Sequence, residues 1–289
     1  MSVSSSRELI ARVAGAAISA GPRVPVTRAA AVVARLRKAV RWSDSRLAEV
    51  CVLPPDLATE VVSLVRRTPV EILDRKGAWK VAVHAVGAMG HRSGLELRAS
   101  ALVGAAMLGR DVVTRLTGIW DEERGTRVLV APNVLDEVRR LALDEKDWCR
   151  WVCLRTSLGA LHHLLAPHLH DHLTHLLRTL PDSGEELARF LLLSDAVARA
   201  SMDSLTTADM PSLRWIRSHE SFRVDPAHVA LVRALTRGGA DVPAAVADVG
   251  SFAHEVVAGG EVAALFSRPE ALPSVAEYGD HAAWARRAR

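Results

Sequence analysis

Apolar residues recur every three to four positions along most of the chain, which is the spacing of amphipathic helices. Prolines, glycines and capping residues divide this pattern into segments. The pattern predicts helices over residues 7–20 and 27–41, a short helix after Ser43, helices over 55–67, 70–89, 95–119, 133–143 and 144–165, helices beginning at Pro167, Ser183 and Asp225, and one over 243–258. The chain is therefore expected to be mainly helical.

One segment alternates apolar and polar residues with the period of a strand. Residues 126–130 are rich in β-formers and follow the turn sequence of residues 122–125. Residues 95–119 are apolar on most of the helix circumference, which is typical of a helix buried in a large core. With no internal repeat and no long linker, we expect a mainly α fold with a small β element. Residues 7–289 would form a single domain with a sub-boundary near 120–127, preceded by a flexible N-terminus at 1–6.

Composition narrows the class of protein. The chain has 289 residues, 49% hydrophobic and 24% charged, as in soluble globular proteins. The longest apolar run, 99–109, is shorter than the roughly 18 residues that span a bilayer, and the N-terminus lacks the pattern of a signal peptide. We therefore expect a cytoplasmic protein that does not contact a membrane.

Charge and cysteine content add two exclusions. The net charge is +4, and the arginines are spread along the chain rather than gathered into a patch, which does not favour nucleic-acid binding. The three cysteines, an odd number in a cytoplasmic context, argue against a disulfide framework. Cys149 and Cys153 are four residues apart on a helix, but buried thiols of this kind usually pack as small apolar side chains.

Histidines are the most distinctive chemical feature, since six of the twelve lie between residues 162 and 175. His168 and His172 are four apart and share a helical face, so they are the candidate ligands of a transition metal. The alternative is a polar helix face with half-exposed imidazoles, and we expect no bound metal or other cofactor. His254-Glu255 begins a zinc-binding pattern that Ala258 interrupts, and no phosphate-binding or nucleophile-elbow motif occurs.

Three stretches resemble a known family. They are Leu129-Val130-Ala131-Pro132-Asn133, then Trp151-Val152-Cys153-Leu154, then Pro167 followed by Asp171-His172-Leu173. They resemble the actinobacterial zincin-like proteins, described as zinc-dependent metalloproteases or as hydrolases associated with deazaflavin-cofactor biosynthesis. The family's central segment reads Val-Ala-Pro-Asn, then Trp-Val-Cys-Leu-His-Glu-x-x-His, then Pro-Trp-Leu-Arg-Asp-His-Leu. Weaker likeness at both ends extends the resemblance to most of the chain, and it implies a zincin-like helical domain.

The chain departs from the family where the resemblance places the zinc site. Arg155 stands at the first ligand position, Thr156 at the general base and Gly159 at the second ligand. Asp195 lies where the family draws a third ligand from a later helix. A zinc peptidase needs two imidazoles and a carboxylate on that helical turn. The resemblance therefore implies a degenerate zinc site without peptidase activity.

Two hypotheses follow. The first is a pseudoenzyme, an accessory, peptide-binding or scaffolding subunit for a partner enzyme, with specialised peptide metabolism as the candidate setting. In that role Arg155 binds a carboxylate of the partner or pairs internally with Asp195. The second is a repurposed enzyme, with a metal at His168 and His172 or acid–base chemistry at His162 or His163. Neither the partner nor the oligomeric state follows from the sequence.

Overall fold

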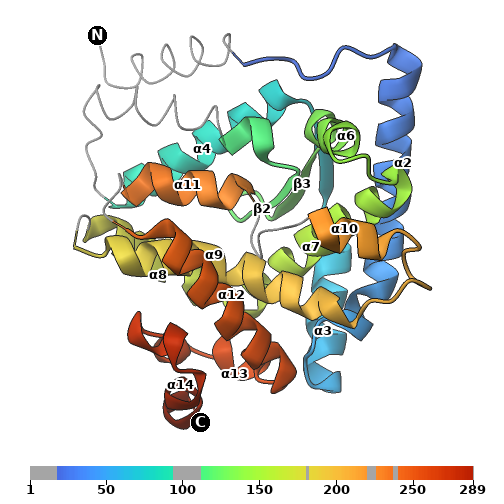
Figure 1. Ribbon diagram of the computed structural model, residues 1–289. Coiled ribbons are helices and arrows are strands. Elements are labelled where there is room, and N and C mark those ends of the chain that lie inside the picture. Colours follow the sequence, from blue (N-terminus) through green and yellow to red (C-terminus); the bar gives the residue numbers. More distant parts are fainter. Residues whose placement is uncertain (1–17, 94–111, 180–181, 220–225, 237–239, 289) are drawn as a thin grey trace, which may run out of the picture.

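The computed structural model describes residues 18–93, 112–179, 182–219, 226–236 and 240–288 (Figure 1). Helices account for most of these residues, and a small sheet lies among them, so the structure is mainly α with a small β element. The elements are α2 (Val26–Val50), α3 (Pro55–Arg67), β1 (Val70–Leu73), α4 (Arg75–Ser93), β2 (Gly118–Asp121), β3 (Thr126–Val130), α6 (Ala131–Arg140), α7 (Glu145–Leu165), α8 (His168–Arg178), α9 (Gly184–Ser201), η1 (Met202–Ser204), α10 (Leu213–His219), α11 (Pro226–Thr236), α12 (Val242–Ala258), α13 (Val262–Leu265), η2 (Pro269–Ala271), η3 (Ala276–Gly279) and α14 (His281–Ala288).

The three strands form one sheet in the order β1–β3–β2. β3 is the strand predicted at residues 126–130, and its burial on both faces agrees with its central place in the sheet. β1 pairs with β3 in parallel, with Val70 opposite Arg127. β2 pairs with β3 antiparallel, with Gly118 opposite Leu129, so that residues 122–125 form the connecting turn.

The strands β1 and β2 correct two helix predictions. The helix predicted over 70–89 begins only at α4, because Val70–Leu73 pairs with β3 and Asp74 then accepts a hydrogen bond from the Gly77 amide at 2.7 Å. The helix predicted over 95–119 lies mostly outside the described residues, but its last two positions belong to β2. Both strands have only four residues, so sheet pairing outweighs the local helical pattern.

Two predicted helix starts are also wrong. Ser43 does not begin a new helix: α2 runs through it, and its buried hydroxyl lies 2.9 Å from that of Ser157 on α7. Asn133 lies inside α6 instead of capping it. Its buried amide nitrogen donates to the carbonyls of Val113 and Leu116, at 2.7 and 2.6 Å, and so fixes the segment that leads into β2.

Two large apolar clusters flank the contact between α7 and α9. One contains α2, α3, α6 and α7 with Leu129 of β3, and the other contains α9, α12, α13 and α14. Figure 1 shows α2 along one side of the molecule and the red C-terminal helices at the lower end. A third, smaller cluster packs α4 against the opposite face of the sheet, around Trp79 and Val130.

The C-terminal segment differs from its sequence-based expectation. The sequence around Trp284 leaves two interpretations, a docking element or a frayed end, of which the frayed end is preferred. In the structure this indole is completely buried and donates to the carbonyl of Ala271 at 2.7 Å, which contradicts the frayed end. The predicted N-terminal helix at 7–20 lies almost wholly outside the described residues. Within the described part of the chain, no helix has the length and apolar character needed to cross a membrane.

Gly118 of β2 lies against Thr156 of α7, and this close approach supplies a test of the packing. A Cβ at residue 118 would overlap the Oγ1 of Thr156, whereas a Cβ at Gly159 on α7 would meet no atom within 4 Å. We expect Gly118→Ala to lower the free energy of unfolding by about 2 kcal/mol through overpacking. Gly159→Ala should instead raise it by about 0.5–1 kcal/mol through helix propensity. Urea titrations check both values.

Adding Thr156→Ala to Gly118→Ala removes the Thr156 hydroxyl and should restore part of the lost stability, because the new methyl group at residue 118 then has no hydroxyl to overlap. Simple additivity of the two substitutions would contradict the close approach.

Candidate functional site

The candidate site lies on α7, the helix on which the resemblance places the zinc ligands. Asp144 and Asp147 are the two candidates for the cap of this helix, and the structure selects Asp144, whose side chain accepts a hydrogen bond from the Asp147 amide at 2.9 Å. Fourteen of its 21 residues are buried, and they lie on nearly all sides of the helix. The polar side chains among them must therefore find partners inside the protein.

Arg155 and Asp195 form a buried ion pair between α7 and α9. The Arg155 Nε lies 3.6 Å from one Asp195 carboxylate oxygen, and the Arg199 Nε lies 3.3 Å from the other. The Arg155 Nη2 also donates to the Thr117 hydroxyl at 2.8 Å. All three charged side chains are less than 10% exposed. One carboxylate thus joins two guanidinium groups in the interior, and it links the two large helices.

The internal pairing of Arg155 with Asp195 is one of the two roles that the sequence suggested for this arginine. Asp195 already lies against the Nε of Arg155, which is one of the donors that a partner's carboxylate would need. Thr156, next in sequence, is also buried, and its hydroxyl donates to the Val152 carbonyl at 2.9 Å, within its own helix. Gly159 follows one turn after Arg155 and leaves open space at its Cα.

These side chains do not fit zinc. A structural or catalytic zinc site requires imidazole, thiolate or carboxylate ligands, and of the four residues at the expected site only Asp195 supplies one. The carboxylate of Asp195 faces two guanidinium groups, which carry a permanent positive charge and have no lone pair to donate. The arrangement therefore provides a fixed ionic link between helices and not a metal-binding set.

His162 is sealed inside the protein at the end of α7. Its Nδ1 lies 3.1 Å from the Ser194 hydroxyl, and its ring stacks on Phe266 with 4.8 Å between centroids. Burial lowers the pKa of His162 to about 3, and the nearby His163 adds to this effect. The imidazole is therefore neutral at physiological pH, and it has no exposed surface with which to contact a ligand.

His163 shares a carboxylate with a second histidine. Its Nδ1 lies 3.7 Å from the Glu122 Oε2, and the Nδ1 of His170 on α8 lies 3.0 Å from the same atom. Burial opposes ionisation of Glu122, but hydrogen bonds and charges from the two histidines outweigh it and lower the pKa of this carboxyl. The contact ties the β2–β3 turn to α7 and α8.

His168 and His172, the alternative metal ligands, lie on α8 as predicted. The His172 Nε2 lies 3.6 Å from the Glu186 carboxylate, and burial lowers the pKa of both imidazoles. Within the described ranges, no group of three or more His, Cys, Asp or Glu side chains is arranged to hold a metal ion. Cys149 and Cys153 are buried free thiols, and burial raises the pKa of Cys149 to about 12.

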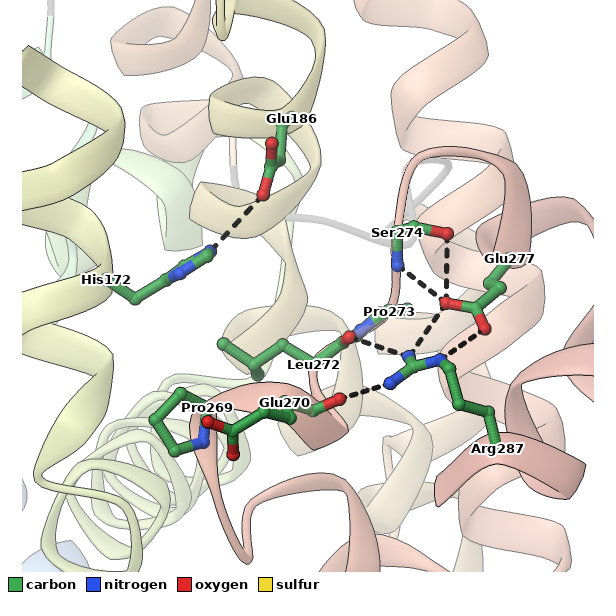
Figure 2. A pocket seen from close by; sticks show the side chains of 9 residues that line it. All are labelled: His172, Glu186, Pro269, Glu270, Leu272, Pro273, Ser274, Glu277 and Arg287. Atoms are coloured by element: carbon green, nitrogen blue, oxygen red, sulfur yellow. Dashed lines mark hydrogen bonds and ion pairs between the residues drawn. The ribbon is translucent and has the colours of Figure 1, made fainter. Parts of the chain in front are cut away.

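A pocket of about 380 Å³ lies beside His172 and Glu186, between α8, α9 and the C-terminal segment (Figure 2). Figure 2 shows the Arg287 guanidinium on its far wall, held by the Glu277 carboxylate and by the carbonyls of Glu270 and Leu272. These bonds attach α14 to the preceding loop. The guanidinium of Arg287 is therefore engaged in contacts within the protein that stabilise the fold.

The structure brings Arg155, Asp195 and Thr156 into one buried region and leaves His163 separate, on Glu122. Sequence reasoning missed Thr117, Ser194 and Glu122, because nothing in their local pattern marks them as partners of α7. Arg199 had a visible signal, its four-residue spacing from Asp195 on one helix.

Comparison with known proteins finds one solved structure that shares the fold of this chain. No protein-family model matches the chain, and no curated protein matches it either. The chain is similar to a crystal structure described as "a putative hydrolase with a novel fold" from Chloroflexus aurantiacus. The two share 16% sequence identity, with a TM-score of 0.70 over 99% of this chain and 98% of the other. At this identity the likeness shows a shared fold.

The ion pair at Asp195 carries a stability prediction. Replacing it by Ala removes the carboxylate that Arg155 and Arg199 share, so the free energy of unfolding should fall by about 3 kcal/mol. The matched control is Asp203→Ala, because Asp203 also faces an arginine but its side chain is 56% exposed. We expect this control to lose less than about 1 kcal/mol. Equal losses in urea titrations would contradict the buried link.

His162 carries a pH prediction. Its pKa is lowered from 6.5 to about 3 in the folded state, so below pH 6.5 only the unfolded chain takes up this proton. Above pH 6.5, protonation of this histidine does not affect the free energy of unfolding. As the pH falls from 6.5 toward 3, proton uptake by the unfolded chain lowers that free energy by about 1.4 kcal/mol per pH unit. Replacing His162 by Leu should remove this part of the slope in chemical denaturation between pH 4 and 6.5. The matched control is His254→Leu, at a histidine whose side chain is 63% exposed.

Proposed function

We propose that this protein is a non-catalytic relative of zincin-like hydrolases, which acts as an accessory subunit that binds a peptide or a partner protein. The observation that carries the proposal is the buried Arg155–Asp195 pair at the position where the resemblance places the metal. A shared fold with a hydrolase-like structure is compatible with this origin. Retention of a fold with replacement of its reactive groups indicates that the fold serves another role.

The local backbone supports this origin. Arg155 and Gly159 lie one turn apart on α7, as the two imidazoles of a zinc helix do. The open space at Gly159 would accept a Cβ atom without displacing a neighbour. The helix therefore keeps the geometry for two ligands, while its side chains supply neither a ligand pair nor a general base. An ionic link joins α7 and α9 in the place where a metal would join them.

The cellular setting that we propose is the cytoplasm. Cys51, Cys149 and Cys153 are all buried free thiols. Proteins with several unpaired thiols are typical of reducing compartments. The partner is proposed to be a protein or a peptide, in keeping with the substrate class that the resemblance implies.

The alternative function is an enzyme that has been repurposed. His163 favours it, because this imidazole is 28% exposed and lies near the Glu122 carboxylate. A base requires access to a substrate proton, and His162, the other candidate, is completely buried. Only one of the two candidate bases can therefore reach a substrate, and we prefer the accessory role.

The test is the metal content of untagged protein, combined with restoration of the ligand pair. We expect substoichiometric zinc, iron and manganese in the wild type and no hydrolysis of casein, with or without added zinc. The double variant Arg155→His/Gly159→His adds two imidazoles beside Asp195 and should bind zinc. Elemental mass spectrometry and the visible spectrum of the cobalt-substituted variant provide the readouts.

Controls separate the two functions. The single variant Gly159→His retains Arg155 and should gain no zinc. A wild-type protein with stoichiometric metal that is lost on His168→Ala or His172→Ala would overturn the accessory role in favour of the repurposed enzyme. Failure of the folded double variant to bind zinc would contradict the origin of the site from a zinc helix.

A further inference from the structure

A row of cations lies on the outer face of α2. Arg37, Lys38 and Arg41 are exposed, and they lie opposite the stripe of residues by which α2 packs into the core. Arg37 and Arg41 are four residues apart, so their side chains leave the helix on the same side. Because α2 lies along one side of the molecule (Figure 1), these three charges face solvent.

The other cations of α2 all have acidic partners. Arg28 and Arg35 both contact the Glu145 carboxylate at the start of α7. Arg46 has two carboxylates close by, at 2.6 and 3.2 Å from its guanidinium nitrogens. The three outer cations differ, because no carboxylate of the described residues forms an ion pair with them. Their charge is therefore available to a partner.

Arg66 of α3 extends this row. It is exposed, and its Nε donates to the backbone carbonyl of Asp44 at 2.9 Å, which places its guanidinium about one turn beyond Arg41 along α2. The Asp44 carboxylate is engaged elsewhere, since its Oδ1 accepts a hydrogen bond from the buried Arg127 at 2.6 Å. We call the resulting surface the α2 basic face; it consists of Arg37, Lys38, Arg41 and Arg66.

Short side chains flank the cations on the same side of α2. Ala30 and Ala34 precede them, Ser45 and Ala48 follow them, and all four residues are exposed. Short side chains allow the axis of a second helix to approach to within about 8–10 Å, the usual distance between packed helices. The α2 basic face therefore leaves room for a segment of another protein whose side chains reach the cations.

The α2 basic face fits carboxylates better than a nucleic-acid backbone. Guanidinium groups bind carboxylates through paired hydrogen bonds, and cations at helical spacing match carboxylates at the same spacing. DNA-binding proteins commonly make about 6–10 phosphate contacts, more than this face can supply. Single strands stack their bases on exposed aromatic rings. Among the described residues the exposed large apolar side chains are Val26, Trp215 and Val275, so no such ring lies on α2 or α3.

We infer that the α2 basic face binds an acidic segment of a partner protein, in which Asp or Glu recurs every three to four residues and pairs with Arg37, Arg41 and Arg66. Complementary rows of charge favour the correct partner and speed up association. The inference goes beyond the proposed function, because it rests on the exposed charges of α2 and α3 and not on the Arg155 site.

Fluorescence anisotropy with two labelled peptides tests the inference. Both peptides are alanine-based helices; one carries glutamates along one face, and the other carries glutamines at the same positions. At low salt we expect the glutamate peptide to bind at least about tenfold more tightly than the glutamine peptide. The difference should shrink in roughly 0.5 M salt, because ions screen exposed charges. Equal binding of the two peptides at low salt would overturn the proposal.

Charge-matched variants locate the binding. Arg37→Gln/Arg41→Gln should weaken the glutamate peptide about tenfold, since each exposed ion pair contributes roughly a factor of three, and should leave the glutamine peptide unchanged. The control Lys76→Gln/Lys80→Gln removes two exposed charges from α4, so it has the same net charge and should bind like the wild type. Circular dichroism checks that both variants are folded. Equal weakening by the two variants would overturn the assignment to α2. Tighter binding of a short DNA duplex that is lost in the α2 variant would assign the face to nucleic acid and overturn the proposal.

Discussion

Burial of α7 on nearly all sides is the constraint on which the rest of the structure depends. Burial favours pairing of the polar side chains that such a helix carries, and three of them contact partners from other elements. Asp147 accepts from the amide and hydroxyl of Ser212, ahead of α10. Ser157 contacts Ser43 of α2 and Arg127 of β3. Arg155 pairs with Asp195 of α9. The polar groups of this one helix thus fix its position against three other helices and one strand.

The Arg155–Asp195 pair has a consequence for chemistry as well as for packing. A metal between two helices joins them and also polarises a bound water. A guanidinium between the same helices joins them through its charge and its hydrogen bonds, but it offers no open coordination position. Desolvation makes such a buried pair weak as a source of net stability, whereas removal of one partner is costly. The pair is therefore best understood as fixing the relative position of α7 and α9.

The sequence predicts elements well where local and tertiary signals agree. α3, α7 and α8 begin where proline or aspartate predicts, and β3 has its expected bounds. Prediction fails for β1 and β2, because four residues carry too little periodicity and their state depends on pairing with β3. Trp284 fails for a similar reason, since only the tertiary fold shows what buries it. At the candidate site, position within a family pattern made Arg155 and Asp195 visible, whereas Thr117, the hydroxyl partner of Arg155, is brought to it only by the tertiary fold.

The strand β2 connects two polar regions of the protein, the closed region around Arg155 on α7 and the side of the sheet that α4 covers. Its first residue, Gly118, lies against Thr156 on α7, and its last, Asp121, lies 3.7 Å from the Arg124 guanidinium on the side of the sheet that α4 covers. Four residues of strand span only about 10 Å, so the two regions lie on opposite faces of one short segment. They differ in access: Arg155 and Asp195 are closed off by helices, while Lys80 is exposed to solvent. The region around Arg155 and Asp195 therefore acts as a rigid support inside the protein, and the face that α4 covers is the more accessible of the two.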